Sequence, residues 1–300
     1  MNMAVAAKER TNLNTLSNDE RKALTRRTYS GESYFEKLFH HDHTEMDCHA
    51  SSEAFRNEIE RILLEKQLIN ESVPLEKLHE VLSDEMKAYN FNDGVNKITT
   101  YFYDTDSQFT NVYHQYIRFL REHFVREPFW FQATPTIRIH CPNAENSHHY
   151  PRYHSDISYG HPPEEINIWL PLTSVMEGHS FRTMSVANSR NILEKFDYDF
   201  GAFIHSAIHD KEFSNYCESL ANPVITEFGR MLAFDSRAIH SGEPMQSHTR
   251  VSMDIRILPL SQYEKMDIEY QGSGRRKILF TPGNCYHSQD SDHLLNIIGS

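Results

Sequence analysis

The sequence lacks several features that would place it in a functional class at once. Its 300 residues include four cysteines, which lie far apart and form no Cys-x-x-Cys pair. Neither a zinc knuckle nor a disulfide framework is indicated, and we expect a reducing compartment. Basic residues number 30 against 42 acidic ones, and the net charge is −12. This disfavours a nucleic-acid partner, because phosphate binding needs clustered lysine and arginine. A small molecule is the expected partner.

Long apolar runs are also missing. No stretch of about 18 apolar residues occurs, as a membrane-spanning helix would need. The opening MNMAVAAKERTNLN has no long apolar centre of the kind found in signal peptides. We therefore expect a soluble, cytoplasmic protein with no membrane partner, and nothing in the sequence indicates an oligomeric state. The hydrophobic content of 39% is sufficient for a sizeable core.

Residues 1–50 are polar and have no sustained apolar face. A capping-box pattern that starts at Ser17 predicts a short helix. The histidine-rich cluster from His40 to His49 is interpreted as a solvated surface segment, to which we assign no role. Part of residues 1–50 is expected to be mobile and to order over the functional site when a substrate binds.

The remaining chain divides into a helical part and a β-rich part. In residues 51–127 apolar side chains recur at helical spacing, as at Phe55 and Ile59, which predicts a helical support region. In residues 128–262 the period changes to two. The runs PTIRIH, EINIWLPLT, PVITEF, RMLAFD and RVSMDIRIL predict a mainly β core, a barrel or a sandwich. Residues 263–300 are predicted to form an irregular tail that packs over this core.

Triplets of the form His-x-Asp or His-x-Glu occur three times, and chance alone gives about three in a chain of this composition. Two of them lie in the polar segment before residue 50. The third, His154-Ser155-Asp156, ends the run YPRYHSD and precedes a strand-like segment. Side chains two apart on a strand share a face, so His154 and Asp156 are expected to point to one interior. The alternative is a hydrogen-bonded pair near a strand end.

A metal site with two histidines and one carboxylate needs a further histidine. His240 is the candidate, because it ends a predicted strand and a short polar turn follows. Arg250 begins the next strand and shares a face with Ser252. A guanidinium binds a carboxylate through two parallel hydrogen bonds, and the serine hydroxyl supplies a third donor. This pair suits a dicarboxylate such as 2-oxoglutarate, anchored behind the metal.

The ordered set His154-x-Asp156, His240 and Arg250-x-Ser252 resembles the signature of the Fe(II)/2-oxoglutarate-dependent dioxygenases. The resemblance covers residues 134–258. The runs INIWLPLTSV and MSVANSR are similar to segments of the phytanoyl-CoA-hydroxylase-like branch, which usually has Pro-Gly-Ser-His where this chain has Val-Ala-Asn-Ser. A weaker likeness, through the run YGHPPEEINIW, is to oxygenases of streptomycin-type biosynthesis.

The resemblance implies a double-stranded β-helix, a cupin-like jelly roll, with helices against one sheet and the site at its mouth. It makes His154, Asp156 and His240 the Fe(II) ligands. Arg250 and Ser252 then bind the distal carboxylate of 2-oxoglutarate. The resemblance also implies O2 as the second cosubstrate.

Asn167 and Arg138 are further candidates for contact with 2-oxoglutarate or substrate. Each lies on a strand predicted to flank the metal strand, and the alternative is a polar side chain on an outer face. Trp169 is expected to be a core or pocket-wall aromatic residue. Five residues near the predicted mouth favour a polar ligand over a long acyl chain: Glu164, Glu165, His179, Arg237 and Arg256.

The implied reaction is hydroxylation of an unactivated C–H bond in a small polar substrate, with 2-oxoglutarate and O2 converted to succinate and CO2. A sugar, an amino acid or a natural-product intermediate would fit. Asp156 argues against halogenation, because halogenating relatives have a small residue there. The alternatives are desaturation or epimerisation by the same chemistry, and a jelly-roll protein that binds a metal or a sugar without redox chemistry. A zinc hydrolase would leave Arg250 and Ser252 unexplained.

Overall fold

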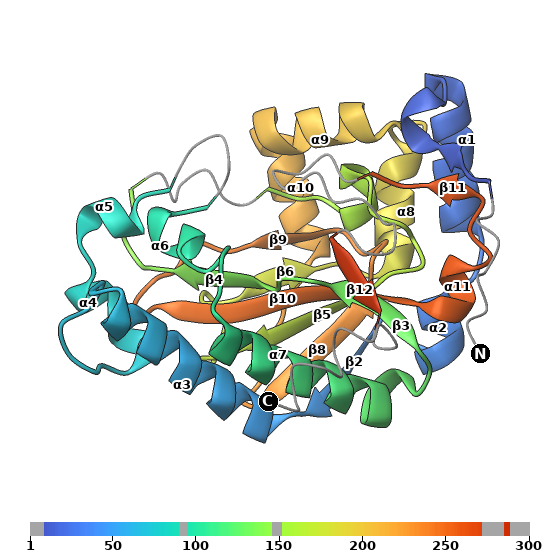
Figure 1. Ribbon diagram of the computed structural model, residues 1–300. Helices are drawn as coiled ribbons and strands as arrows, with labels where there is room; N and C mark the ends of the chain where they lie inside the picture. The colour runs from blue at the N-terminus through green and yellow to red at the C-terminus, as the bar shows by residue number, and fades with distance from the viewer. Residues whose placement is uncertain (1–8, 90–94, 146–151, 272–284, 289–300) are drawn as a thin grey trace, which may run out of the picture.

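The computed structural model describes residues 9–89, 95–145, 152–271 and 285–288 (Figure 1). Helices make up 43% of this part of the chain. The fold is therefore a mixed arrangement of helices and sheets, and the prediction of a mainly β protein was wrong in this respect. Within the described ranges, no helix is both long and apolar enough to cross a membrane.

A large antiparallel sheet forms the centre of the fold (Figure 1). Its order is β12-β3-β10-β5-β8-β2, and β4 pairs with β10 beside β3. The long strand β10 pairs with β4 through its first half, with β3 at its end, and with β5 along the other edge. The strands are β2 (His43–Asp47), β3 (Phe129–Gln132), β4 (Thr136–His140), β5 (Ile166–Pro171), β8 (Arg230–Asp235), β10 (Arg250–Pro259) and β12 (Tyr286–Ser288). Four of the five predicted runs are thus confirmed as β4, β5, β8 and β10.

A smaller antiparallel sheet, in the order β7-β6-β9, packs across one face of the large one. It consists of β6 (Phe181–Thr183), β7 (Asn222–Pro223) and β9 (His240–Gly242). The ring of Phe181 lies 4.9 Å from that of Trp169 and 5.8 Å from that of Phe234, both of which belong to the large sheet. Trp169 is buried, as expected of a core or wall aromatic residue. The two sheets are consistent with a cupin-like fold, and closure into a jelly roll stays a prediction.

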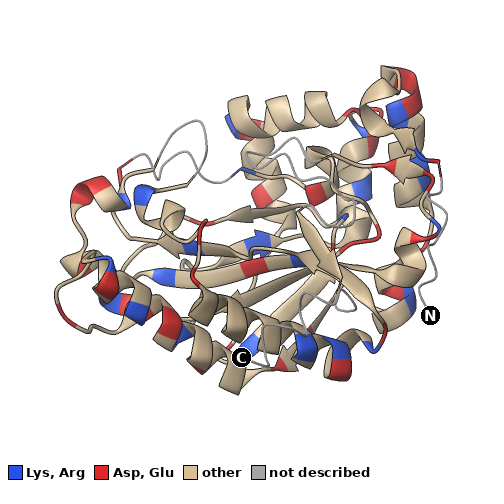
Figure 2. Ribbon diagram, viewed as in Figure 1, with Lys and Arg blue, Asp and Glu red and all other residues tan. Residues whose placement is uncertain are grey.

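Alternation along β10 gives the large sheet an apolar and a polar face. Val251, Met253, Ile255 and Ile257 enter the main hydrophobic core, which also holds residues of the helices below the sheet. Their neighbours on β10 point the other way, toward the small sheet: Arg250, Ser252, Asp254 and Arg256. In Figure 2 the strand β10 carries both blue and red segments, since it contains arginine and aspartate residues.

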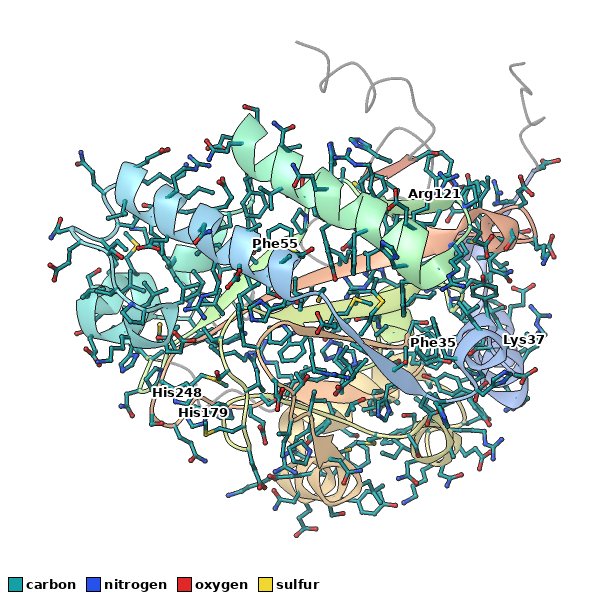
Figure 3. The ribbon with its side chains drawn as sticks, turned by 90° about the horizontal axis from the view of Figure 1, so that it is seen from below. Phe35, Lys37, Phe55, Arg121, His179 and His248 are labelled. Carbon is teal, nitrogen blue, oxygen red and sulfur yellow. The ribbon has the colours of Figure 1, made fainter. Side chains whose placement is uncertain are left out.

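Two long helices, α3 (His49–Glu65) and α7 (Ser107–Leu120), cover the apolar face of the large sheet (Figure 1). The ring of Phe55 on α3 lies 5.7 Å from the rings of Phe109 and Tyr116 on α7. Figure 3 shows Phe55 beside this helix pair. The predicted helical periodicity of both segments is confirmed, and α7 continues into a π-helical turn at Arg121–Val125.

The N-terminal part contains α1 (Asn18–Ser30) and α2 (Tyr34–Phe39). The capping box at Ser17 is present as predicted, and Ser33 forms a second one. The histidine-rich cluster that we interpreted as a surface segment contains β2, an edge strand paired with β8. Its side chains alternate between exposed and half-buried positions. The mobility expected for part of residues 1–50 stays a prediction.

Three helices between β6 and β7 were not predicted: α8 (Val186–Glu194), α9 (Phe200–His209) and α10 (Lys211–Leu220). Each begins after a capping side chain, namely Ser185, Asp199 and Asp210. The mainly β core predicted for residues 128–262 is thus interrupted by three helices over this stretch. The caps and the apolar spacing in this segment were signals that could have identified the helices.

Shorter elements complete the described chain. Where an irregular tail was predicted, β11 (Ile268–Glu269) pairs in parallel with β1 (Thr11–Asn12), and β12 joins the large sheet. The short helices are α4 (Leu78–Val81), α5 (Asp84–Lys87), α6 (Lys97–Thr100) and α11 (Leu260–Tyr263). Single 3-10 turns occupy Leu13–Thr15, Leu75–Lys77 and Asp156–Tyr159.

Candidate metal centre

The three predicted metal ligands come together between the two sheets. One potential ligand atom each from His154, Asp156 and His240 lies within 4.8 Å of the other two. The Oδ1 atom of Asp156 is 4.0 Å from Nε2 of His154 and 3.9 Å from Nε2 of His240. These distances are too long for hydrogen bonds, which excludes the alternative of a simple hydrogen-bonded His–Asp pair. In the described part of the chain, this is the one cluster of at least three such side chains.

The backbone fixes the relative position of the two histidines. The N–H of His154 donates to the carbonyl oxygen of His240 at 3.0 Å, and the N–H of His240 donates to that of His154 at 2.8 Å. His240 begins β9, whereas we expected it to end a strand. Asp156 is also not on a strand, because it is the first residue of the 3-10 turn Asp156–Tyr159. The turn nevertheless directs its carboxylate to the same interior as His154.

Each histidine is oriented by a bond from its second ring nitrogen. The Nδ1 atom of His154 lies 2.8 Å from the carbonyl oxygen of Arg152, and Nδ1 of His240 lies 3.0 Å from that of Ala238. A neutral imidazole that donates from Nδ1 keeps the lone pair of Nε2 for a metal. Burial, together with the neighbouring His240, lowers the pKa of His154 to about 3, so this ring stays neutral near pH 7.

The two oxygens of Asp156 have different neighbours. Oδ1 faces the histidines, whereas Oδ2 accepts a hydrogen bond from Nε of Arg256 at 2.8 Å and forms an ion pair with its Nη2, also at 2.8 Å. Burial disfavours the charged carboxylate, but the charge of Arg256 and the nearby histidines outweigh it. The pKa of Asp156 is therefore held well below its usual range. Sequence reasoning placed Arg256 near the mouth and did not identify this contact.

Arg250 and Ser252 lie on the same inner face, toward the other end of β10. Arg250 is buried, with an exposed fraction of 3%, and its Nη1 donates to the carbonyl oxygen of Ser180. Ser252 is fully buried, and its hydroxyl has no hydrogen-bond partner among the described residues. A buried hydroxyl without a partner is costly, which favours a polar ligand at this place.

Asn167 and Arg138 both lie on strands that flank β10. Asn167 is opposite Arg256 in the register of β5 and β10, and it is 3% exposed. Neither its amide nitrogen nor its oxygen has a partner within the described ranges. Arg138 is opposite Ser252 and forms an ion pair with Asp254. The geometry thus favours Asn167 more strongly than Arg138 as a ligand contact.

Thr183 is a residue that sequence reasoning missed. It is opposite His240 in the register of β6 and β9, so the two side chains share a face. Its Oγ1 atom is buried and has no partner among the residues that the structure describes. No motif marks this threonine, because its place depends on the pairing of two strands far apart in sequence.

Besides Arg256, which binds Asp156, three of the five residues expected near the mouth have structural partners. Glu165 is 1% exposed, and it contacts His161 and Tyr286. The ring of His179 stacks on that of His248 at 3.7 Å, and its Nε2 accepts a hydrogen bond from the N–H of Ser247. Figure 3 labels the two histidines, which lie close together. Arg237 is the third and forms part of a separate network. These residues therefore do not support the inference of a polar mouth.

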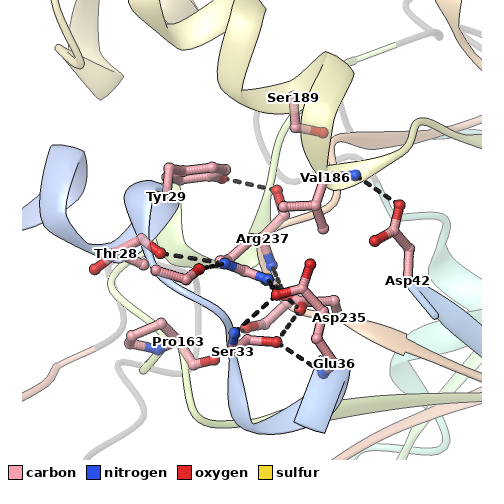
Figure 4. Close-up of polar contacts among 12 residues, drawn as sticks. Thr28, Tyr29, Ser33, Glu36, Asp42, Pro163, Val186, Ser189, Asp235 and Arg237 are labelled. Atoms are coloured by element: carbon pink, nitrogen blue, oxygen red, sulfur yellow. Dashed lines mark hydrogen bonds and ion pairs between the residues drawn. The ribbon is translucent and has the colours of Figure 1, made fainter. Parts of the chain in front are cut away.

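Arg237 supports the segment that leads to His240 (Figure 4). It is 1% exposed, and it binds both oxygens of Asp235 as well as Oε2 of Glu36 on α2. Its carbonyl oxygen accepts a hydrogen bond from Tyr29 on α1. A cavity of about 430 Å³ adjoins this network and is lined in part by Tyr29, Glu36 and Arg237. Asp42, which also lines this cavity, accepts a hydrogen bond from the N–H of Val186, the first residue of α8.

Comparison with known proteins gives one curated relative and several solved structures. No known family profile matches the chain. The streptomycin biosynthesis protein StrG of Streptomyces griseus is 29% identical over 168 residues, which are 55% of this chain and 64% of that protein. The chain thus spans less than two thirds of the length of this relative.

The solved structures have low sequence identity. The non-heme α-ketoglutarate-dependent carbocyclase SnoK from nogalamycin biosynthesis is 13% identical with a TM-score of 0.46, covering 93% of this chain and 98% of that one. HygX from Streptomyces hygroscopicus, solved with nickel and 2-oxoglutarate bound, is 11% identical with a TM-score of 0.45, covering 76% and 85%. Sequence identities and TM-scores this low do not assign a function, so the functional assignment depends on the geometry of the site itself.

Proposed function

We propose that the chain is an Fe(II)- and 2-oxoglutarate-dependent oxygenase. The observation that carries this proposal is the convergence of two imidazole nitrogens and one carboxylate oxygen from His154, His240 and Asp156. Two histidines and one carboxylate leave further metal positions open, which is the arrangement of non-haem Fe(II) oxygenases. When bound, the iron and 2-oxoglutarate supply the oxidising chemistry with O2.

The residues beyond the metal ligands fit a dicarboxylate. Arg250 offers a planar guanidinium from a buried position, and the hydroxyl of Ser252 two residues on lacks a partner in the described structure. These groups would bind the distal carboxylate of 2-oxoglutarate by two or three charge-assisted hydrogen bonds. Asn167 would contact the other end of 2-oxoglutarate or the substrate, because its unpartnered amide lies beside Arg256, which holds Asp156.

The protein's own part in the reaction is to bind, orient and exclude water. Arg152 and Ala238 hold the two histidines in their ligating tautomer through backbone carbonyl oxygens. Phe181 and Phe234 lie 6.2 and 5.2 Å from the ring of His240 and form an apolar wall. Such a wall limits the access of water to a reactive centre.

The default overall reaction is R–H + O2 + 2-oxoglutarate → R–OH + succinate + CO2, with a small polar substrate. A sugar or another natural-product intermediate is the class we favour, and the streptomycin biosynthesis relative supports this choice. Desaturation or epimerisation would consume the same cosubstrates and would be distinguished by the mass of the product.

The test begins with metal and cosubstrate binding. Under anaerobic conditions, Fe(II) plus 2-oxoglutarate should give a weak visible charge-transfer band, which a non-redox binding protein or a zinc hydrolase would not give. A substrate panel is then scored by succinate release above the uncoupled background and by a mass gain of one oxygen. A protein that binds Fe(II) but never 2-oxoglutarate would contradict the proposed function.

Asp156→Ala removes the anionic ligand, so iron stoichiometry and coupled turnover should both fall sharply. Asp42→Ala is the matched control, since Asp42 belongs to an equivalent His-x-Asp triplet. It should keep the iron, although it loses its hydrogen bond to α8. An Asp156→Ala protein that remains folded, binds one iron with unchanged affinity and still turns over would refute the assignment.

A further inference from the structure

The strongest unassigned feature is a buried network behind the metal-binding carboxylate. It starts at Asp156, passes through Arg256 of β10, and extends to Glu165 and Tyr286. Asp156, Glu165 and Tyr286 are each 3% exposed or less. Buried charges are retained where they are paired and hydrogen-bonded. We therefore asked which function these paired charges serve at the metal centre.

Arg256 approaches Asp156 from one side only. Its Nε and Nη2 atoms both lie 2.8 Å from Oδ2, whereas Oδ1 is the oxygen that faces the two histidines. The N–H of Nε therefore occupies a lone pair of Oδ2, and the guanidinium charge at Nη2 lies against the same oxygen. An oxygen with a charge-assisted hydrogen bond and an ion pair to one guanidinium is a poor additional metal ligand, because binding a metal would break these contacts.

The position of Arg256 is itself fixed by the strands around it. Between Asp254 and Ile257, β10 changes partner from β4 to β3. At this place the N–H of Arg256 donates to the side-chain Oε1 of Gln132 at 3.1 Å. Gln132 is in turn opposite Tyr286 in the register of β3 and β12. The backbone of Arg256 is thus held where the ladder is interrupted.

A second carboxylate balances the charge of Arg256. The negative charges of Asp156 and Glu165 both act on the guanidinium of Arg256. Glu165 is oriented by the hydroxyl of Tyr286 and by Nδ1 of His161, which is 2.9 Å away. Tyr286 lies on β12, so a strand near the end of the sequence supports the metal ligand.

We propose that Arg256 is a positioning residue that keeps Oδ2 of Asp156 away from the metal, so that the carboxylate binds through Oδ1 alone. The number of open metal positions then depends on Arg256. This inference rests on the proposed function only in assuming that a metal binds at His154, Asp156 and His240. With the carboxylate bound through both oxygens, one fewer position would remain for 2-oxoglutarate and O2.

The first test uses the unmodified protein loaded with Co(II) or Ni(II) in the absence of O2. Its crystal structure should show Oδ1 on the metal and both contacts of Arg256 to Oδ2 retained. A wild-type structure with both oxygens of Asp156 on the metal would overturn the proposal. This measurement needs no variant and decides the question even if the variants do not fold.

The second test compares three variants by the visible spectrum of bound Co(II) without 2-oxoglutarate, which reports coordination number. Arg256→Met removes every donor and should change the spectrum. It should also weaken 2-oxoglutarate binding about tenfold or more. Arg256→Lys keeps a charged donor and should resemble the wild type. Arg61→Met is the matched control, because Nε and Nη2 of Arg61 on α3 both donate to Oε2 of Glu58, at 3.0 and 2.7 Å, on the opposite side of the large sheet.

The outcomes separate this inference from the proposed function. A folded Arg256→Met protein with an unchanged Co(II) spectrum would overturn the positioning role, even if 2-oxoglutarate binding were weakened by loss of a direct contact. A wild-type protein that holds Co(II) through Oδ1 alone but never binds 2-oxoglutarate would refute the proposed function and leave the positioning role intact.

Discussion

The hydroxyl of Tyr29 donates a hydrogen bond of 2.7 Å to the carbonyl oxygen of Arg237, and its oxygen lies 3.3 Å from Oγ of Ser155. Ser155 separates His154 from Asp156, and Arg237 lies shortly before His240 in the chain. One side chain of α1 therefore contacts both segments that carry the proposed metal ligands. Figure 4 shows the bond from Tyr29 to Arg237. The N-terminal helices are in this sense part of the metal centre.

Tyr29→Phe should lower both stability and metal affinity. It leaves the buried carbonyl of Arg237 without its donor, which costs about 1–3 kcal/mol in the free energy of unfolding. Urea unfolding and a metal titration measure the two effects. Tyr198→Phe is the control, because the hydroxyl of Tyr198 contacts only Glu194 of its own helix region, and it should change stability by about 0.5 kcal/mol or less. Equal losses in the two variants would contradict the special position of Tyr29.

Arg237→Ala should be among the most destabilising single changes. It leaves the charge of Asp235, which is 1% exposed, without its partner. Breaking a buried pair in this way costs about 3–5 kcal/mol. Arg26→Ala breaks an exposed pair with Asp197 at 2.6 Å and should cost at most about 1 kcal/mol. Chemical unfolding of the two variants measures both losses in the free energy of unfolding. Similar losses would contradict the stabilising role of the Arg237 network.

Arg250→Lys should weaken 2-oxoglutarate binding much more than metal binding. The planar fork is lost, while His154, Asp156 and His240 remain. Titration of the Ni(II)-loaded protein with 2-oxoglutarate measures the first effect, and a competing chelator measures the second. Should Arg138→Lys cause the larger loss of 2-oxoglutarate affinity, the anchor would have to be moved to Arg138.

Acid should destabilise the protein before its carboxylates titrate. Burial lowers the pKa of His114 to about 4, and it lowers that of His140 well below its ordinary value. A base whose pKa falls on folding binds protons more readily in the unfolded chain. The stability that depends on these neutral rings is thus complete above about pH 6.5 and declines as the pH falls toward the folded values.

Urea unfolding between pH 7 and 4 measures this decline. His114→Gln should reduce its slope, since one of the rings that must accept a proton is then absent. A free energy of unfolding that stays constant from pH 7 to 4 would contradict the assignment of buried neutral histidines.

The proposed metal ligands could be identified because their chemistry is visible in single residues and in their order along the chain. His154, Asp156, His240 and Arg250 are residue types with few common alternatives at a metal or carboxylate site. The strands β5, β8 and β10 could also be predicted from the sequence, since alternation over five or more residues is a local pattern. These features needed no knowledge of which strand pairs with which.

The contacts that these residues make with the rest of the protein could not be predicted from the sequence. The bond from Arg256 to Asp156 joins residues 100 positions apart, and Thr183 faces His240 only because β6 pairs with β9. Arg237 and Glu165 were read as polar residues of a mouth, although each is buried with a partner. A charged side chain on a sequence gives no sign of whether it will face water or a counter-charge.

The exchange of backbone hydrogen bonds between His154 and His240 has a consequence for how the site assembles and opens. A pair that exchanges both bonds holds its α-carbons at about 5.5 Å, so the spacing of the two imidazoles is built into the main chain before any metal arrives. The amide protons of these two residues should therefore exchange with solvent in one concerted event. The shared hydrogen-exchange rate of these two amides would therefore measure how often the centre opens. The measurement needs no metal, cosubstrate or turnover.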